Sequence, residues 1–234
     1  MTWSEKFSFF STLDLAALAV LLVCWVVIGW LIERGIGARL SVSMLMAQYR
    51  RDWMQQMIGR EPRVFDAQIL ATLRQGTAFF ASATMIAIGG CLALLGNTER
   101  LAGIAEDLTL GTDPAVVWEV KILVILGFLA NAFFKFVWAN RLFGYCGVVM
   151  GAVPNDAAHP DATIRATQAG EINIFSARSF NRGLRSVYFG LAAGAWMLGP
   201  EALLVAALLT FAMLIRREFM SRSHRTLQRH PTQT

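Results

Sequence analysis

The chain has 234 residues, of which 56% are hydrophobic and 16% are charged, a balance too apolar for an ordinary soluble domain. Its 21 Lys and Arg residues outnumber its 16 Asp and Glu residues, giving a formal net charge of +5. Eighteen of the 21 basic residues fall in three stretches separated or bordered by uncharged apolar runs. Basic loops of membrane proteins stay in the cytoplasm, so this pattern indicates membrane topology and argues against nucleic-acid binding.

The first apolar run has 18 residues without a charge, 15–32, which correspond to roughly 27 Å of helix. It ends at Glu33-Arg34 without the small-residue cleavage site of a signal peptide. We therefore expect a retained membrane span at about residues 14–32.

Residues 41–60 have a different pattern, in which apolar side chains recur every three to four positions and polar ones occupy the other faces. This pattern predicts an amphipathic helix lying along the cytoplasmic membrane surface. A helix that binds a partner protein would have a similar pattern.

An uncharged run of 21 residues, 76–96, predicts the second span. It carries two neighbouring stripes of mostly small side chains, which are Ala78, Ser82, Ile86 and Gly90 in one and Ala83, Ala87 and Cys91 in the other. Small side chains let two helix backbones approach closely, without proving that a dimer forms.

The segment 97–115 carries four carboxylates and one arginine, so we expect it on the outer side of the membrane. Apolar residues between 101 and 108 suggest a short helix that rests on the membrane. Asp113-Pro114 resembles an N-cap followed by the proline that often opens a helix.

Residues 116–138 predict a third span, because Trp118 and Trp138 lie 20 residues apart, or roughly 30 Å along a helix. Indoles at both ends are expected at the membrane interfaces. Lys121 and Lys135 lie close enough to the ends to reach lipid headgroups.

The next apolar run, 142–153, either continues this helix or packs against the bundle. A polar segment follows at 154–185, in which helical spacing of apolar residues predicts a second surface helix over 161–177. Four arginines in this segment keep it in the cytoplasm.

Gly199-Pro200-Glu201 interrupts the last apolar region. A single span there would place Glu201 at mid-bilayer, which costs a few kcal/mol, and would send the C-terminal arginines outside. A hairpin with arms at 186–199 and 201–216 keeps them inside, although each arm has uncharged residues for only about 20 Å of helix. We expect the hairpin, followed by a polar tail at 217–234.

These elements predict an all-α, polytopic transmembrane helix bundle that forms a single integral membrane domain over residues 1–234. It would make about five membrane passes, with cytoplasmic amphipathic helices beside them. The expected location is the bacterial inner membrane, with the N-terminus in the periplasm and the C-terminus in the cytoplasm.

Several segments resemble an uncharacterised bacterial and plant membrane family, domain of unknown function family 599. The segments are YRRDWMQQM, LRQGTAFFASATMIAIGG, FKFVWANRLFGYC, and RGLRSVYFGLAAGAWMLGP followed by RREFMS. The likeness covers roughly residues 10–225, and its most specific part is the last block. The resemblance implies a multispanning inner-membrane protein, and it implies no activity, substrate or catalytic residue.

The sequence contains no recognisable catalytic, cofactor-binding or metal-binding motif. The three cysteines lie in apolar runs without CxxC spacing, which is typical of packed thiols. The three histidines, His159, His224 and His230, fall in polar segments and are expected at the solvated surface. We expect a protein that is not an enzyme.

Two groups of residues are the candidate sites. Asn131 and Lys135 share one face of the third span, where they would make either a helix–helix contact or a polar path for a solute. The second group would contact anionic phospholipid headgroups or a partner protein, and it consists of Arg50, Arg51, Trp53, Arg182 and Arg185.

The most direct functional hypothesis is a structural or accessory component that packs against other membrane proteins, as a homo-oligomer or in a larger membrane complex. The first alternative is a small-solute or ion transporter. The second is a lipid-active membrane enzyme, although its candidate acids and bases, Asp52, Asp66, Glu171 and His159, are scattered along the chain.

Overall fold

The computed structural model describes residues 9–99, 103 and 114–228. Within these residues the regular structure is helical, apart from an isolated antiparallel bridge between Ile36 and Arg39. The all-α prediction is therefore confirmed. The short helix expected between 101 and 108 and the N-cap expected at Asp113 lie outside the described residues.

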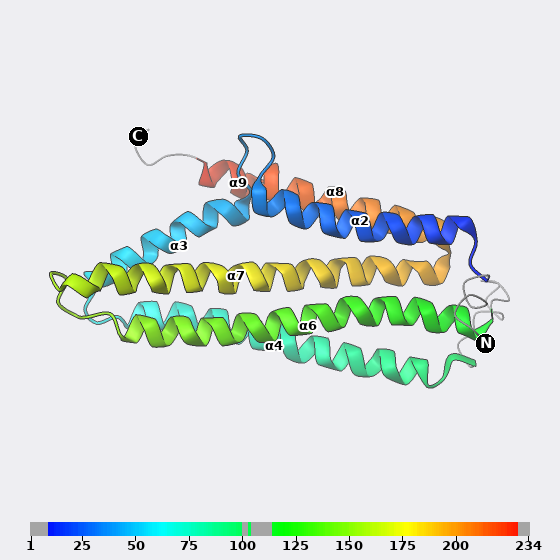
Figure 1. The fold of residues 1–234 in the computed structure, drawn as a ribbon, viewed down its shortest axis with the longest axis horizontal. Helices are drawn as coiled ribbons and strands as arrows, with labels where there is room; N and C mark the ends of the chain where they lie inside the picture. The colour runs from blue at the N-terminus through cyan, green and yellow to red at the C-terminus, as the bar shows by residue number, and fades with distance from the viewer. Residues whose placement is uncertain (1–8, 100–102, 104–113, 229–234) are drawn as a thin grey trace. The chain divides into compact units, whose positions relative to one another are not determined.

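The helices, labelled as in Figure 1, are α2 (Thr12–Arg34), α3 (Val42–Ile58), α4 (Val64–Leu95), α6 (Ala115–Gly151), α7 (Pro160–Gly194), the 3₁₀ turn η1 (Ala195–Leu198), α8 (Pro200–Phe219) and α9 (Arg222–Leu227). In the described part of the chain, α2, α4 and α6 are long and apolar enough to cross a membrane. The spans predicted at 14–32 and 116–138 lie within α2 and α6, and the span predicted at 76–96 lies in α4 up to Leu95. The run 142–153 extends α6 as far as Gly151.

The surface helix predicted at 161–177 and the hairpin arm predicted at 186–199, as far as Gly194, belong to one helix, α7. The polar residues between them do not end the helix, because their side chains bond to neighbouring helices. The Ser179 hydroxyl donates to the Lys135 carbonyl at 2.9 Å, and the Asn181 amide donates to the Ser43 hydroxyl at 3.4 Å. The polarity of this segment reflects packing between helices.

The described structure groups into two compact units, and each unit contains part of α2, α4, α6, α7 and α8. The first, here called the apolar unit, comprises residues 1–30, 83–132 and 184–215. It has 4 basic and 8 acidic residues, for a net charge of −4. The second, the basic unit, comprises 31–82, 133–183 and 216–234, with 17 basic and 8 acidic residues and a net charge of +9.

Polar side chains connect the helices of the apolar unit. The Trp196 indole, almost fully buried in η1, donates to Asp14 of α2 at 2.7 Å. Trp25 meets Phe128 edge to face, with ring centroids 5.3 Å apart. Lys121 was predicted to reach headgroups, but it is only 4% exposed, and its amine lies 4.9 Å from the centre of the Trp118 ring. The cation–π contact accounts for this inward position.

The chain turns back between α7 and α8, as the hairpin prediction requires (Figure 1). Gly199 has φ of +120°, a conformation that glycine adopts most readily, and Pro200 opens α8. In the basic unit, Ser43 bonds to both Asn181 of α7 and Glu218 of α8. Asn181 lies 18 residues before Gly199 and Glu218 lies 19 residues after it, and both contact the same residue. The chain therefore returns along itself after Gly199, and α7 and α8 run antiparallel there.

The link from α2 to α3 satisfies backbone groups at both helix ends. Gly35, with φ of +83°, donates its N–H to the Leu31 carbonyl and closes α2 in the left-handed conformation. The Ser41 hydroxyl donates to the Ile32 carbonyl at 2.7 Å and accepts from the Met44 N–H, which caps α3. The Glu218 carboxylate accepts from the Ser43 N–H, where the positive end of the α3 dipole stabilises it.

The core of the basic unit lies between α3, α4, α6 and α7. Met54, Met57, Phe143, Cys146 and Ala169 are among its buried residues. A second contact group consists of three phenylalanine rings, from Phe80, Phe136 and Phe180, whose centroids lie 5.5 Å apart in each pair. Gly183 packs directly under one of these rings.

Gly183→Ala should destabilise the protein, because the added Cβ would lie 2.6 Å from the Phe136 ring. Overpacking of this kind costs about 1–3 kcal/mol, which exceeds the gain of about 1 kcal/mol in helix propensity. Gly144→Ala is the matched control on α6, since nothing lies within 4 Å of its added Cβ. Thermal unfolding in detergent should rank Gly183→Ala below the parent and Gly144→Ala at or above it. Equal stability of the two variants would contradict the packing described.

Candidate functional site

Asn131 and Lys135 both contribute polar atoms to contacts between α6 and α7. In the apolar unit, the Asn131 amide donates to the hydroxyl of the fully buried Ser186 at 2.7 Å. In the basic unit, the Lys135 carbonyl accepts from Ser179. This arrangement favours the helix–helix interpretation of the two residues, while a polar path for a solute stays a prediction.

Arg50, Arg51 and Trp53 of α3 make contacts inside the basic unit. The Arg50 guanidinium donates to Asn173 of α7, and burial lowers the pKa of Arg50. The Arg51 Nε lies 2.6 Å from Glu171, with both side chains substantially exposed, so this ion pair contributes little to stability. The Trp53 indole donates to Asp66 at 2.7 Å.

Arg182 and Arg185 lie on α7 and have different surroundings. In the basic unit, the Arg182 guanidinium donates through Nε to Glu33 of α2 at 2.8 Å, and this hydrogen bond raises the pKa of Arg182. In the apolar unit, Arg185 is buried, and two of its guanidinium nitrogens would lie 3.9 Å from a Cβ on Gly29. Gly29 therefore leaves room for this side chain.

Asp66 is a buried carboxylate that the site prediction left out. It lies in the first turn of α4 and is fully buried, and one of its oxygens accepts hydrogen bonds from Trp53 and Arg60. The position at a helix N-terminus favours its negative charge. An acidic residue in the first helical turn, directly after an arginine-rich link, is the sequence signal that could have indicated it.

Arg63 joins the ends of two helices in the basic unit. Its guanidinium donates to the Val153 and Pro154 carbonyls, each at 2.7 Å, and to the Ile58 carbonyl at 3.3 Å. These carbonyls lie at or just beyond the C-terminal ends of α6 and α3, where no helical N–H can bond to them. Arg63 thus serves the same purpose as a helix C-cap.

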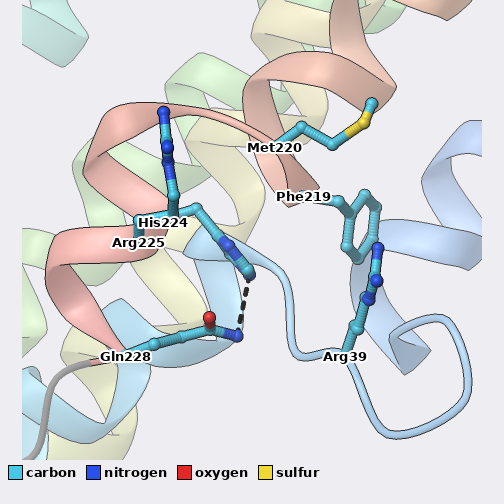
Figure 2. A pocket seen from close by; sticks show the side chains of 6 residues that line it. All are labelled: Arg39, Phe219, Met220, His224, Arg225 and Gln228. Carbon is cyan, nitrogen blue, oxygen red and sulfur yellow. Dashed lines mark hydrogen bonds between the residues drawn. The ribbon is translucent and has the colours of Figure 1, made fainter.

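Two cavities in the basic unit carry arginines. The first, here called the α4–α6 cavity, has a volume of about 330 Å³ and is lined by residues that include Arg63, Arg74, Leu70, Gly147, Met150 and Asn155. The second, the α9 cavity, has a volume of about 520 Å³ and is lined by Arg39, Phe219, Met220, His224, Arg225 and Gln228. Figure 2 shows the six side chains of the α9 cavity.

His224 was predicted at the solvated surface, but it is 4% exposed. Its Nε2 donates to the Leu40 carbonyl at 2.9 Å and lies 3.3 Å from the Gln228 amide nitrogen (Figure 2). The reason is that residues of the predicted polar tail form α9, which contacts α3 and is capped by Ser221. Among the described residues, no cluster of three or more His, Cys, Asp or Glu side chains could hold a metal ion.

The family described as "Protein of unknown function, DUF599" matches residues 16–223. Because this match covers most of the 234 residues, the chain belongs to that family. No curated protein and no solved structure matches it. The family and the three apolar helices together show a membrane protein.

A double-mutant cycle with Asn131→Leu and Ser186→Ala should reveal coupling between the two residues. Interhelical hydrogen bonds in membrane proteins contribute about 0.6 kcal/mol on average and up to about 1.7 kcal/mol, so we expect a coupling energy in this range. Unfolding free energies of the parent, the two single variants and the double variant provide the measurement. Strict additivity, within about 0.3 kcal/mol, would argue that the contact does not form.

Proposed function

We propose that this DUF599 protein is a structural component of the bacterial inner membrane, which packs through α4 against a second copy of itself, and that it is neither an enzyme nor a transporter. The observation that carries the proposal is the exposure of α4. Only 6% of its most apolar 18-residue window is buried, compared with 28% for α2 and for α6. Protein therefore covers little of this apolar window of α4.

The side chains on α4 favour a helix over lipid as that neighbour. Ala78, Ser82 and Gly90 of the first stripe are exposed, and so are Ala83 and Ala87 of the second. Lipid tails cover any apolar surface equally well, whereas small side chains allow a second helix backbone to come close and gain van der Waals contact. Open space surrounds the Cβ positions of Gly76, Gly89 and Gly90, which supports such an approach.

The proposal also assigns the basic unit to the cytoplasmic side of the membrane. Positively charged residues near the ends of spans favour the cytoplasm, and the basic unit has 17 of them against 4 in the apolar unit. Five passes with this orientation put the N-terminus in the periplasm. The exposed arginines of the basic unit would then lie near anionic phospholipid headgroups.

Oxidation of native membranes should join two copies through Cys91, which lies in the second stripe of α4. A Cys24→Ser variant keeps Cys91 together with Cys146, and Cys146 is buried in the core of its own chain. With a copper–phenanthroline catalyst we expect a disulfide-linked dimer, because a close helix pair brings Cα atoms within the 4.4–6.8 Å or so that a disulfide needs. Further substitution of Cys91→Ser should abolish it.

The matched control moves the thiol outside both stripes of α4. Leu92→Cys in a chain with Cys24→Ser and Cys91→Ser places the sulfur about 100° around the helix from position 91, at nearly the same depth and at an exposed position. If the two small-residue stripes form the interface, this variant should give little disulfide-linked dimer. Equal yields from positions 91 and 92, or no dimer from either, would overturn the proposal.

A further inference from the structure

The α4–α6 cavity combines charge with an apolar wall. Arg63 and Arg74 line it together with Asn155, and no acidic residue is among its lining residues. Leu70 and Met150 contribute apolar surface. A volume of about 330 Å³ lies at the lower end of the range for small-molecule sites. The chemistry suits a negatively charged group joined to an apolar one.

One guanidinium nitrogen of Arg63 has no partner within the described part of the chain and could bond to a ligand. Its two terminal nitrogens bond to carbonyls of the chain, as described above. Its Nε is buried and has no hydrogen-bond partner among the residues that the structure describes. Buried donors nearly always have partners, so an unpaired guanidinium nitrogen in a cavity-lining residue indicates an acceptor supplied by a bound molecule.

Arg74 supplies a second charge on the same side of α4. It lies 11 residues after Arg63, which is about three helical turns and roughly 16 Å along the axis. Its side chain is exposed and makes no hydrogen bond or ion pair with any of the described residues. It immediately precedes the span predicted at 76–96, where a lipid headgroup could reach it from the membrane.

Glycines on α6 leave the cavity open. A Cβ on Gly147 would lie 3.1 Å from Leu70, so the two helices are already close at this point. Gly151 lines the cavity, and nothing lies within 4 Å of the place where its Cβ would be. A larger side chain at Gly151 would therefore take up free space at the wall of this cavity.

We propose that the α4–α6 cavity binds an anionic phospholipid, with the phosphate ester between Arg63 and Arg74 and the first part of an acyl chain against Leu70 and Met150. Guanidinium groups bind phosphate oxygens through charge-assisted hydrogen bonds, which accounts for both arginines. The α9 cavity has arginines as well, but its lining residues have no buried donor without a partner. This proposal does not depend on dimerisation through α4.

The test uses the full chain purified in a neutral detergent, with binding measured by native mass spectrometry and by thermal shift. The probes are dioctanoyl phosphatidic acid, dioctanoylglycerol, which lacks the phosphate, and glycerol phosphate, which lacks the acyl chains. We expect phosphatidic acid to bind at least tenfold more tightly than either of the other two. Equal binding of glycerol phosphate would point to a soluble phosphate ester and would overturn the lipid assignment.

Arg74→Gln should weaken the binding of phosphatidic acid about tenfold or more, while Arg225→Gln, which removes the same charge elsewhere in the basic unit, should leave it within about twofold. Gly151→Leu should also weaken binding, although it changes no charge. Thermal unfolding without lipid confirms that each variant is folded. If Arg74→Gln and Arg225→Gln had equal effects, the lipid would be binding to the basic surface in general, and the proposed site would be refuted.

Discussion

Charged side chains cannot lie unpaired in the hydrocarbon of a membrane, and this constraint orders the whole molecule. Each of the five long helices contributes an apolar part to one unit and a more polar part to the other. The resulting charges of −4 and +9 come from a single chain whose overall excess is only +5. Three of the four excess negative charges of the apolar unit come from the segment 97–115, whereas the parts of α6, α7 and α8 in the basic unit each carry a net positive charge.

Within the basic unit, most of the arginines singled out above bond to other parts of the chain. Arg182 pairs with Glu33, Arg50 with Asn173, and Arg63 holds the ends of two helices. Such contacts fix the helices of this unit to one another and add polar contacts between α3 and α7 to the apolar contacts of Met54. Exposed arginines such as Arg74 remain available to bind a partner or a lipid. The proposed lipid site is therefore expected to depend on Arg74 in particular.

Hydrophobic periodicity was sufficient to predict the apolar helices and the turn at Gly199, because a span needs a long uncharged run and a glycine-proline pair ends a helix. It could not predict that α7 continues through its arginines, since that depends on Ser43 and Glu33, which are more than 130 residues away. The burial of His224 was missed for the same reason, because its partner Leu40 lies 184 residues away and no local pattern identifies it. Asp66 is a different case: its partner Trp53 lies only 13 residues away, and its place in the first turn of α4 was a local signal. The sites of long-range polar contact are thus where sequence patterns carry least information.

The side of the membrane on which the basic unit lies is tested most directly by labelling single thiols in intact spheroplasts with a membrane-impermeant maleimide. Ser223→Cys on α9 and Glu99→Cys after α4 are both at exposed positions. We predict that the thiol at Glu99→Cys reacts from outside, and that the thiol at Ser223→Cys reacts only after the membrane is permeabilised. Labelling of Ser223→Cys in sealed spheroplasts would contradict the cytoplasmic assignment of the basic unit and the odd number of passes that follows from it.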